Sequence, residues 1–130
     1  LPIAALKFGA SGAVGTDIDP NAGPAVIKNT DDNRIDKDSF EYIEGNILTD
    51  EGLRLRLEKR ADILTANILP DVLLPLFPIA RRLLKPDGIF IVSGIIDAKA
   101  EEIKSELKNY DFNVLEENSE GEWFCFVAKP

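Results

Sequence analysis

The sequence contains no histidine and only one cysteine, which removes several kinds of chemistry. Without histidine, no histidine-based catalytic triad, proton shuttle or zinc site can be built. A single cysteine forms no internal disulfide and no paired-cysteine redox motif, which is typical of a reducing compartment. We therefore expect a cytoplasmic protein whose chemistry needs no metal.

Long apolar runs and a leader segment are also missing. No apolar run reaches the roughly 18 residues of a transmembrane helix, and no basic, apolar leader opens the chain, so we expect neither a membrane span nor a secretion signal. Methionine is absent even from position 1. This absence suggests a fragment, a processed product or a sequence from which some residues have been dropped.

Basic residues are fewer than acidic ones. The sequence has 15 Lys and Arg and 23 Asp and Glu, which gives a net charge of −8. Nucleic acids and anionic membranes both need Lys and Arg gathered on one face, so we expect neither as a direct partner. The charge suits a cationic partner or cofactor, although an acidic surface also serves solubility. The length of 130 residues and the apolar share of 45% predict one folded domain. The sequence carries no signal for oligomeric state.

Short apolar runs alternate with longer helical stretches along the chain. Strands are predicted at residues 13–18, 40–43, 61–69, 89–93, 112–115 and 123–127. Helices are expected at residues 3–8, after Asp19, along 73–84 with kinks at Pro75 and Pro78, and after an Asp97 cap. Residues 53–59 are also assigned to a helix, although Leu-Arg-Leu-Arg-Leu alternates like a strand. Residues 85–88 (Lys-Pro-Asp-Gly) fit a type I turn, and residues 118–121 fit a hairpin turn.

The order of these elements predicts an α/β fold. Strands that are apolar on both faces and separated by helices indicate a mostly parallel sheet covered on both sides. The last two strands add an antiparallel hairpin at or near one edge. We therefore predict a Rossmann-like, doubly wound sheet whose ligand lies past the carboxyl ends of the strands.

The helix after Asp19 is the least regular of the predicted elements. Asp19 and Pro20 fit an N-cap followed by the first helical residue. Gly23 and Pro24 would interrupt that helix, since an interior proline costs about 3 kcal/mol. The alternative is a helix that begins at Pro24 and ends near Asn29.

Asp17 is the first candidate binding residue. A carboxylate at a strand end can accept hydrogen bonds from both hydroxyls of an adenosine ribose, and the apolar Ile18 beside it can lie against the adenine. The alternative is that Asp17 or Asp19 only caps the next helix; we assign Asp17 to the ribose and Asp19 to the cap. The glycine-rich loop expected about 20 residues before such an acid is missing. The strand before that loop, the first of the fold, is then missing too.

Two asparagines also follow strands. We expect Asn67 to be buried, with its amide oxygen accepting a hydrogen bond from a substrate amine, or else to cap the next helix or tie down the strand end. Asn46 stands where the amino group of adenine could be held, or it is only a turn residue. Gly94 permits the close approach of a ligand or helix, or it merely ends a strand. Cys125 is expected in the core and Trp123 at the sheet edge.

These segments together resemble class I S-adenosylmethionine-dependent methyltransferases. The general resemblance rests on residues 14–20 (Val-Gly-Thr-Asp-Ile-Asp-Pro), residues 83–88 and the final hairpin. Residues 3–10, 17–20, 66–69 (Ala-Asn-Ile-Leu) and 93–95 (Ser-Gly-Ile) narrow it to the ribosomal-protein methyltransferases of the PrmA type. That family methylates the eleventh protein of the large ribosomal subunit. The resemblance spans essentially the whole chain.

The resemblance implies a protein methyltransferase with S-adenosyl-L-methionine as its cofactor. The substrates would be lysine side chains and the N-terminal amine of a basic ribosomal protein. Asp17 would hold the ribose, with Ile18 beside the adenine and Asn46 also binding the cofactor. Asn67 would line the methionine end of the cofactor and face the incoming amine, as the catalytic residue.

Three departures from the family pattern bear on activity. The glycine-rich loop with its strand is missing, the N-terminal substrate-recognition domain is missing, and Gly23-Pro24 interrupts a helix that is usually regular. Residues 1–130 are thus expected to form a single, partial S-adenosylmethionine-binding domain that is inactive alone.

Three other functions remain open at this point. A nicotinamide-dependent oxidoreductase also uses a ribose-binding acid, but the chain has no Tyr-x-x-x-Lys pair and no histidine. A methyltransferase for glutamine or a small molecule usually has Asn-Pro-Pro-Tyr where this chain has Asn-Ile-Leu-Pro at residues 67–70. A truncated, inactive α/β domain acting as an interaction module is the non-enzymatic alternative.

Overall fold

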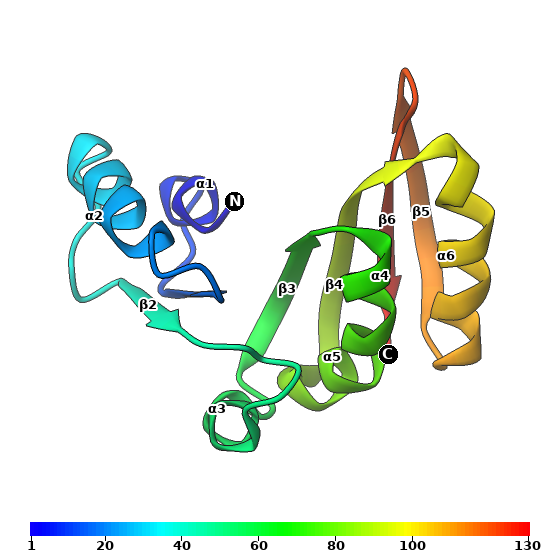
Figure 1. Cartoon of the computed structure of the whole chain (residues 1–130), viewed down its shortest axis with the longest axis horizontal. Helices are drawn as coiled ribbons and strands as arrows, with labels where there is room; N and C mark the ends of the chain where they lie inside the picture. Colours follow the sequence, from blue (N-terminus) through cyan, green and yellow to red (C-terminus); the bar gives the residue numbers. More distant parts are fainter. The chain divides into compact units, whose positions relative to one another are not determined.

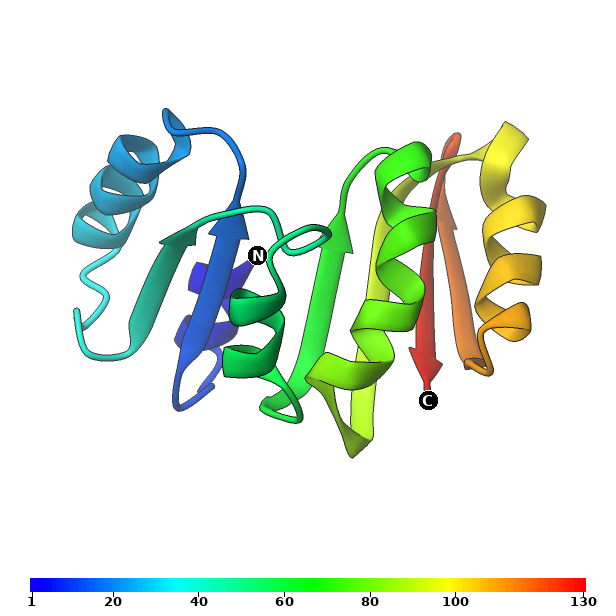
Figure 2. The ribbon, with the colours of Figure 1, turned by 60° about the horizontal axis from the view of Figure 1, so that its bottom comes forward.

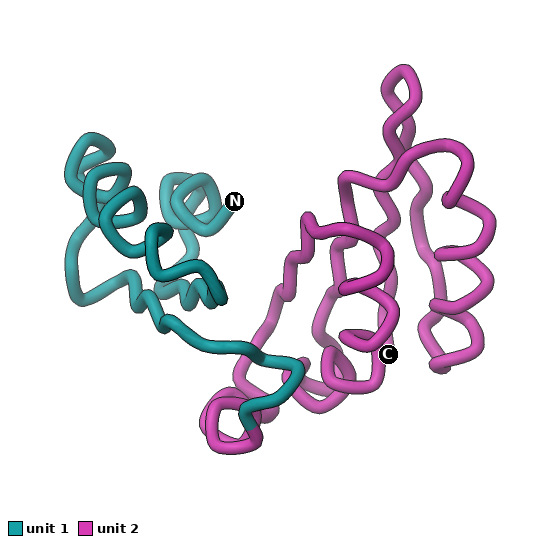
Figure 3. The backbone as a smooth tube through the Cα atoms, in the orientation of Figure 1, with its two compact units in different colours: residues 1–50 teal, residues 51–130 magenta.

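The computed structural model describes all 130 residues and contains both helices and strands (Figure 1). The chain divides into two compact units, residues 1–50 and residues 51–130 (Figure 3). Unit 1 contains α1 (Pro2–Lys7), β1 (Ala13–Asp17), α2 (Ala22–Asp32) and β2 (Phe40–Glu44). Unit 2 contains α3 (Glu51–Leu57), β3 (Ala61–Asn67), α4 (Pro70–Leu73), the 3-10 helix η1 (Leu74–Leu76), α5 (Phe77–Leu83), β4 (Leu84–Ile96), α6 (Asp97–Asn109), β5 (Asn113–Glu120) and β6 (Trp123–Lys129).

In unit 1, β1 and β2 form a parallel pair. Ala13 lies opposite Phe40, and Asp17 lies opposite Glu44, so the two strands end in the same row. No residue of this unit is fully buried. The carboxyl ends of both strands therefore lie together at one edge of the pair, where the sequence placed its first candidate residues.

Helix α2 begins at Ala22, and the expected interruption at Gly23-Pro24 is wrong. Pro24 is the third helical residue. Because the first four N–H groups of a helix have no helical acceptor, a proline at this position removes no helical hydrogen bond. A Cβ on Gly23 would lie 3.3 Å from Cε1 of Tyr42, so glycine leaves room for that ring against the first turn. The helix then continues past the expected end at Asn29, to Asp32.

In unit 2, four strands form a mixed sheet in the order β3-β4-β6-β5 (Figure 2). β3 and β4 are parallel, and β6 is antiparallel to both of its neighbours. Helices α4, α5 and α6 lie on one face of this sheet (Figures 1 and 2). The α/β class, the parallel pairs and the antiparallel hairpin are thus confirmed.

The core of the described chain lies in unit 2. Phe77, Phe90 and Phe112 are almost completely buried and contact one another through their rings. On the same side of the sheet, β4 and β6 bury alternate residues, which include Phe90, Val92, Phe126 and Ala128. Helix α6 closes this core with Ile103 and Leu107. Every second residue of these strands is buried, and the buried residues of α6 recur with the period of a helix. Both patterns agree with the spacing of apolar residues in the sequence.

Proline accounts for the broken helix between β3 and β4. Pro70, Pro75 and Pro78 each stand at the first or second position of α4, η1 and α5 respectively. These early positions tolerate proline because their N–H groups have no helical acceptor. The predicted kinks are therefore confirmed, and so is the predicted helix at residues 53–59, which forms as α3.

Two predicted turns are wrong in position. Residues 85–88 lie within β4 as an irregularity: Leu84 pairs with Ala61 and Ile89 with Ile63, so the four residues between lie opposite Asp62 alone. Lys85 donates to Asp62 across this bulge at 2.7 Å. The hairpin turn is formed by residues 121–122, because β5 continues to Glu120.

Two predicted helix caps are also wrong. Asn21 is the N-cap of α2, and Ile96 is the N-cap of α6; neither makes a side-chain cap hydrogen bond. Asp97 is the first residue of α6, where its charge still favours the positive end of the helix. None of the helices combines the length and apolar character needed to cross a membrane.

Glu51 of α3 forms hydrogen bonds with one arginine of its own helix and with one arginine of α5. Its carboxylate accepts hydrogen bonds from Arg82 at 3.0 Å and from Arg54 at 2.6 Å. These hydrogen bonds, first from Arg82 and then from Arg54, lower the pKa of the Glu51 carboxyl group. A lowered folded-state pKa stabilises the fold above the unfolded pKa of glutamate, and this stabilisation is lost as the pH falls through the folded-state pKa.

We therefore expect Glu51→Gln to lower the free energy of unfolding at neutral pH, with a difference from wild type that disappears in acid. The effect is small because the ion pairs are exposed. Urea unfolding followed by Trp123 fluorescence measures it at neutral pH and at a pH below the folded-state pKa of Glu51, which is lower than the value of about 4.3 for free glutamate. Glu116→Gln is the control for the loss of one charge. An equal loss at both pH values would contradict ionisation as the cause.

Candidate functional site

Asp17 is held at the end of β1 by a turn that uses one of its oxygens. Its Oδ1 accepts the N–H of Asp19 at 2.9 Å, and its backbone carbonyl accepts the N–H of Gly45 at 2.9 Å. The side chain is exposed, and each carboxylate oxygen can accept two hydrogen bonds. Asp17 thus presents a fixed carboxylate with acceptor capacity left for a ligand with hydroxyl groups.

The residues that follow shape this turn. The Oδ1 atom of Asp19 accepts the N–H of Asn21 at 2.8 Å, so Asp19 stabilises the entry to α2 from two residues before the N-cap. Ile18, between the two acids, leaves 69% of its surface exposed. An apolar side chain this exposed beside a hydrogen-bonding carboxylate is suited to cover a flat, apolar ring.

Tyr42 connects the same turn to β2 and is not among the residues predicted from the sequence. Its hydroxyl donates to the backbone carbonyl of Asp19, with 3.4 Å between the oxygens. Desolvation raises the pKa of Tyr42, and the negative charges of Asp17, Glu44 and Asp19 raise it further. The phenol therefore remains a hydrogen-bond donor through the neutral range. Its position two residues before the end of a strand beside the Asp17 turn was the available signal.

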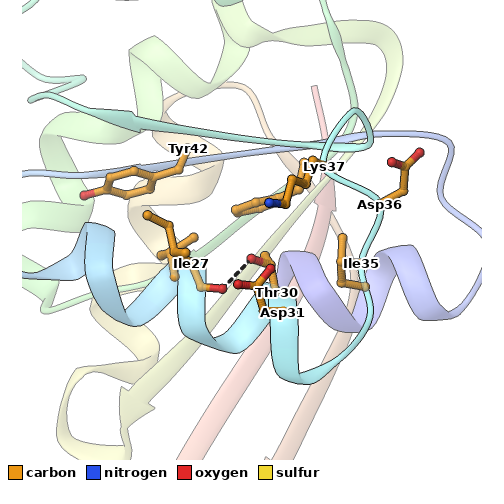
Figure 4. A pocket seen from close by; sticks show the side chains of 9 residues that line it. Ile27, Thr30, Asp31, Ile35, Asp36, Lys37 and Tyr42 are labelled. Carbon is orange, nitrogen blue, oxygen red and sulfur yellow. Dashed lines mark hydrogen bonds between the residues drawn. The ribbon is translucent and has the colours of Figure 1, made fainter.

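Tyr42 also lines a pocket of about 270 Å³ in unit 1, beside α2 and β2 (Figure 4). Ile27, Ile35 and Phe40 make part of its wall, and Asp31, Asp36 and Lys37 supply charged groups. Thr30, also in the wall, donates its hydroxyl to the carbonyl of Ile27 at 2.8 Å. None of the predicted site residues lines this pocket.

Asn46 forms a turn, in agreement with the alternative prediction that it is only a turn residue. Its Oδ1 accepts the N–H of Leu48 at 2.9 Å, and its carbonyl accepts the N–H groups of Thr49 and Asp50. The amide NH₂ makes no such bond within the turn. A role toward the amino group of adenine, which needs the oxygen as acceptor, stays a prediction.

Asn67 ends β3 in unit 2, and its side chain is exposed, so the expected burial is wrong. Leu69 is the N-cap of α4 and that helix has no side-chain cap bond, which rules out Asn67 as its cap. Gly94 has a φ of +75°, and a Cβ there would lie 2.2 Å from Oδ1 of Asn67. Gly94 therefore does permit a close approach, and the group that approaches is the Asn67 amide.

A second pocket, of about 300 Å³, lies near Gly94 at the end of the β5–β6 hairpin. Its wall includes Ser93 and Cys125, which pair across β4 and β6. Cys125 is only half-buried, so the expectation of a core cysteine is wrong, although burial raises the pKa of its thiol. Trp123 lies on the inner strand β6 and not at the sheet edge. No cluster of three or more acidic or cysteine residues in the structure is suited to hold a metal ion.

Comparison with known proteins identifies the family. The model of the family "Ribosomal protein L11 methyltransferase (PrmA)" matches residues 1–130. The chain belongs to this family. The resemblance read from residues 66–69 and 93–95 is thereby confirmed.

Relatives of this family are similar over the whole chain. The ribosomal protein L11 methyltransferase of Lachnospira eligens is 43% identical over 131 residues, which cover 99% of this chain and 41% of the relative. The ribosomal protein L11 methyltransferase of Agathobacter rectalis is 38% identical over 130 residues, which cover 99% of this chain and 40% of the relative. The chain thus spans about two fifths of the length of these curated relatives.

Solved structures agree with the fold. The ribosomal protein L11 methylase of Lactobacillus delbrueckii subsp. bulgaricus is 28% identical with a TM-score of 0.84, covering 98% of this chain and 62% of that one. The fibrillarin of Aeropyrum pernix, solved with S-adenosyl-L-methionine, has a TM-score of 0.71 at 16% identity and supports the fold alone. The family match favours none of the alternative functions.

Proposed function

We propose that this chain is the catalytic part of a protein methyltransferase. It transfers methyl groups from S-adenosyl-L-methionine to amines, both lysine side chains and the N-terminus, of ribosomal protein L11. The observation that carries this proposal is the Asn67 amide, which stands exposed against Gly94 at the end of β3 in a chain of the L11 methyltransferase family. Residues 1–130 belong to a single, partial cofactor-binding domain in this proposal.

The residues of unit 1 fit the adenosine part of the cofactor. The Asp17 carboxylate is exposed and oriented by the Asp19 N–H, which suits the two hydroxyls of a ribose. The exposed Ile18 supplies an apolar surface for the adenine. Asn46 is proposed as a further cofactor-binding residue, with one lone pair of its oxygen already used by Leu48.

Asn67 is the proposed catalytic residue. Bound S-adenosylmethionine supplies a sulfonium methyl, an electrophile reactive enough that the chain needs no covalent intermediate. The chain must hold a neutral amine in line with that methyl, and Oδ1 of Asn67 does so by accepting a hydrogen bond from the amine N–H. Such positioning can supply about 7–11 kcal/mol of the barrier.

The charge of the chain supports the proposed partner. A net charge of −8 favours a basic protein acceptor and disfavours direct binding to nucleic acid or to an anionic membrane. We place the reaction in the cytoplasm, in keeping with the single cysteine.

The cofactor assignment is tested in a hybrid enzyme, in which these 130 residues replace the matching segment of the Lachnospira eligens relative. Calorimetric titration with S-adenosylhomocysteine is expected to show binding by the hybrid. Asp17→Ala should weaken it about 10- to 100-fold, since hydrogen bonds to a charged group contribute about 1.5–3 kcal/mol. Asp38→Ala, which removes another exposed carboxylate of unit 1, is the matched control. If the two variants bound S-adenosylhomocysteine equally well, the assignment of Asp17 to the ribose would be wrong. If the hybrid did not bind it at all, the assignment of the cofactor would be wrong.

Methyl transfer by the same hybrid tests Asn67. With radiolabelled cofactor and purified L11, Asn67→Ala is expected to lower kcat while the affinity for S-adenosylhomocysteine changes less. Asn113→Ala, at the start of β5, controls for the loss of an amide. If Asn67→Ala left both turnover and cofactor affinity unchanged, the catalytic role would be abandoned.

A further inference from the structure

The pocket at the end of the β5–β6 hairpin has a wall that combines an acid with an aromatic ring. Glu120 and Trp123 lie directly opposite each other across the two-residue turn, and Asn118 lies opposite Cys125 two residues further in. All four residues line the pocket, whose volume is about 300 Å³. Trp123 leaves 51% of its surface exposed, an unusual fraction for the largest apolar side chain of the hairpin.

These four side chains share the face of the sheet that points away from α6. Phe126 is buried, and Glu117, which lies opposite it, forms an ion pair with Lys104 of α6. Successive side chains of a strand point to opposite faces. The neighbours of Phe126 and Glu117, Cys125 and Asn118, therefore point away from α6, and so do Trp123 and Glu120.

One wall of the pocket lies on the same row of the sheet as Asn67. Ser93 pairs with Asn67 on one side and with Cys125 on the other, and Cys125 pairs with Asn118. Residues directly opposite each other in a sheet present their side chains on one face. The amide of Asn67 and the pocket thus open on one face. Cys125 lies two strand spacings of about 4.8 Å from Asn67, and Trp123 lies two residues further along β6, so about 12 Å separate Trp123 from Asn67.

The charge of the hairpin selects the ligand. Residues 113–123 contain four glutamates and no lysine or arginine. Only Glu117 of these forms an ion pair, with Lys104, so Glu120 has no cation within ion-pair distance. An exposed indole ring beside a carboxylate binds a cation through its π face and through charge, and it also covers an aliphatic chain.

We propose that this pocket is a recognition subsite for a lysine of the protein acceptor that is not itself methylated. Trp123 covers the aliphatic part of that lysine, and Glu120 takes its ammonium group. The acceptor segment then runs across the strands from the pocket to Asn67. This inference rests on the proposed function for its acceptor, but its contacts lie entirely within unit 2.

The geometry also sets the spacing of the two lysines. An extended peptide covers about 3.3 Å per residue, so a gap of about 12 Å corresponds to three or four residues. The bound lysine should therefore stand three or four residues from the methylated one. A peptide whose lysines are adjacent would place both at the same end of the row.

Trp123 makes the test direct, because it is the only tryptophan of the chain. The chain is titrated with the peptide acetyl-Ala-Lys-Ala-Ala-Lys-Ala-amide at low salt while Trp123 emission is recorded. We expect a saturable change with a dissociation constant near or below about 1 mM. Glu120→Gln should weaken binding about fivefold, and so should acetylation of both lysines. Added salt should weaken binding by the wild type.

The matched control is Glu101→Gln on α6, which removes one negative charge from the other side of the sheet. It should bind the peptide as the wild type does. The proposal is overturned if the wild type shows no change in Trp123 emission, or if Glu120→Gln and Glu101→Gln bind equally well. It is also overturned if the acetylated peptide binds as tightly as the charged one.

Failure of this inference is distinguishable from failure of the proposed function. Cofactor binding by the hybrid enzyme without peptide binding at Trp123 would remove the subsite and leave the methyltransferase. Peptide binding that depends on Glu120, without any binding of S-adenosylhomocysteine by the hybrid, would remove the methyltransferase and leave the subsite.

Discussion

Gly94→Ala is expected to slow methyl transfer by the hybrid enzyme about 100-fold, because it displaces the Asn67 amide. The new Cβ would lie 2.2 Å from Oδ1 and 3.3 Å from Cγ of Asn67, so that side chain must move. A displacement of about 1 Å in a positioning group can cost about 100-fold in rate. Asn67 is exposed and has room to move, so the backbone of β3 need not follow.

The same substitution should leave the protein folded. The φ of +75° at Gly94 strains an alanine by about 1–2 kcal/mol, well below the 5–15 kcal/mol by which domains are usually stable. Urea unfolding measures this loss, and initial rates of methyl transfer to L11 measure the effect on kcat. Because the substitution acts through Asn67, the double variant Gly94→Ala/Asn67→Ala should be no slower than Asn67→Ala alone.

Gly9→Ala is the matched control for backbone strain. Gly9 has a φ of +102°, and no atom lies within 4 Å of the position its Cβ would take. It should lose stability to a similar extent without a large loss of rate. If the rate of the double variant fell by the product of the two single losses, Gly94 would not act through Asn67. The same conclusion would follow if Gly9→Ala lost as much rate as Gly94→Ala.

The strands could be predicted because their apolar residues are close in sequence. All six predicted strands are present, and the one at residues 89–93 is the interior of the longer β4. The extension of β4 to Leu84 could not be predicted, since residues 85–88 have the composition of a turn. They remain in the strand because Leu84 pairs with Ala61 beyond them, a contact between residues far apart in sequence.

The residue types of the candidate site could be predicted, but their environments could not. Asn67 follows a strong apolar run, which suggested burial. The structure exposes it at the end of β3, and the missing side chain of Gly94 leaves space for its amide. Pro24 shows the reverse case, because α2 begins two residues later than expected, at Ala22, and this places the proline among the early positions that tolerate it.

The pocket beside Trp123 could not be predicted because it depends on strand register. The sequence placed the hairpin turn at residues 118–121, whereas the structure places it at 121–122. A shift of one residue in pairing moves every side chain to the other face of a sheet. Only the observed register puts Glu120 opposite Trp123 and joins Ser93 to both Asn67 and Cys125.

Phe90→Ala is expected to lower the free energy of unfolding by about 3–5 kcal/mol. Phe90 is completely buried on β4, where its ring meets that of Phe77 edge-on at 6.0 Å and that of Phe112 at 5.3 Å. Alanine would leave a cavity and remove both ring contacts, each contributing about 0.5–1.5 kcal/mol beyond burial. Urea unfolding of the chain followed by Trp123 fluorescence and circular dichroism measures the loss.

The matched control is Phe8→Ala, since Phe8 leaves 92% of its surface exposed and should change stability by no more than about 0.5 kcal/mol. Phe90→Leu keeps much of the apolar volume and should fall between wild type and Phe90→Ala. Equal effects of Phe90→Ala and Phe8→Ala would contradict the placement of the core between β4 and the helices of unit 2. Because every fully buried residue belongs to unit 2, the loss should also shift the transition reported by Trp123, which stands on the same sheet.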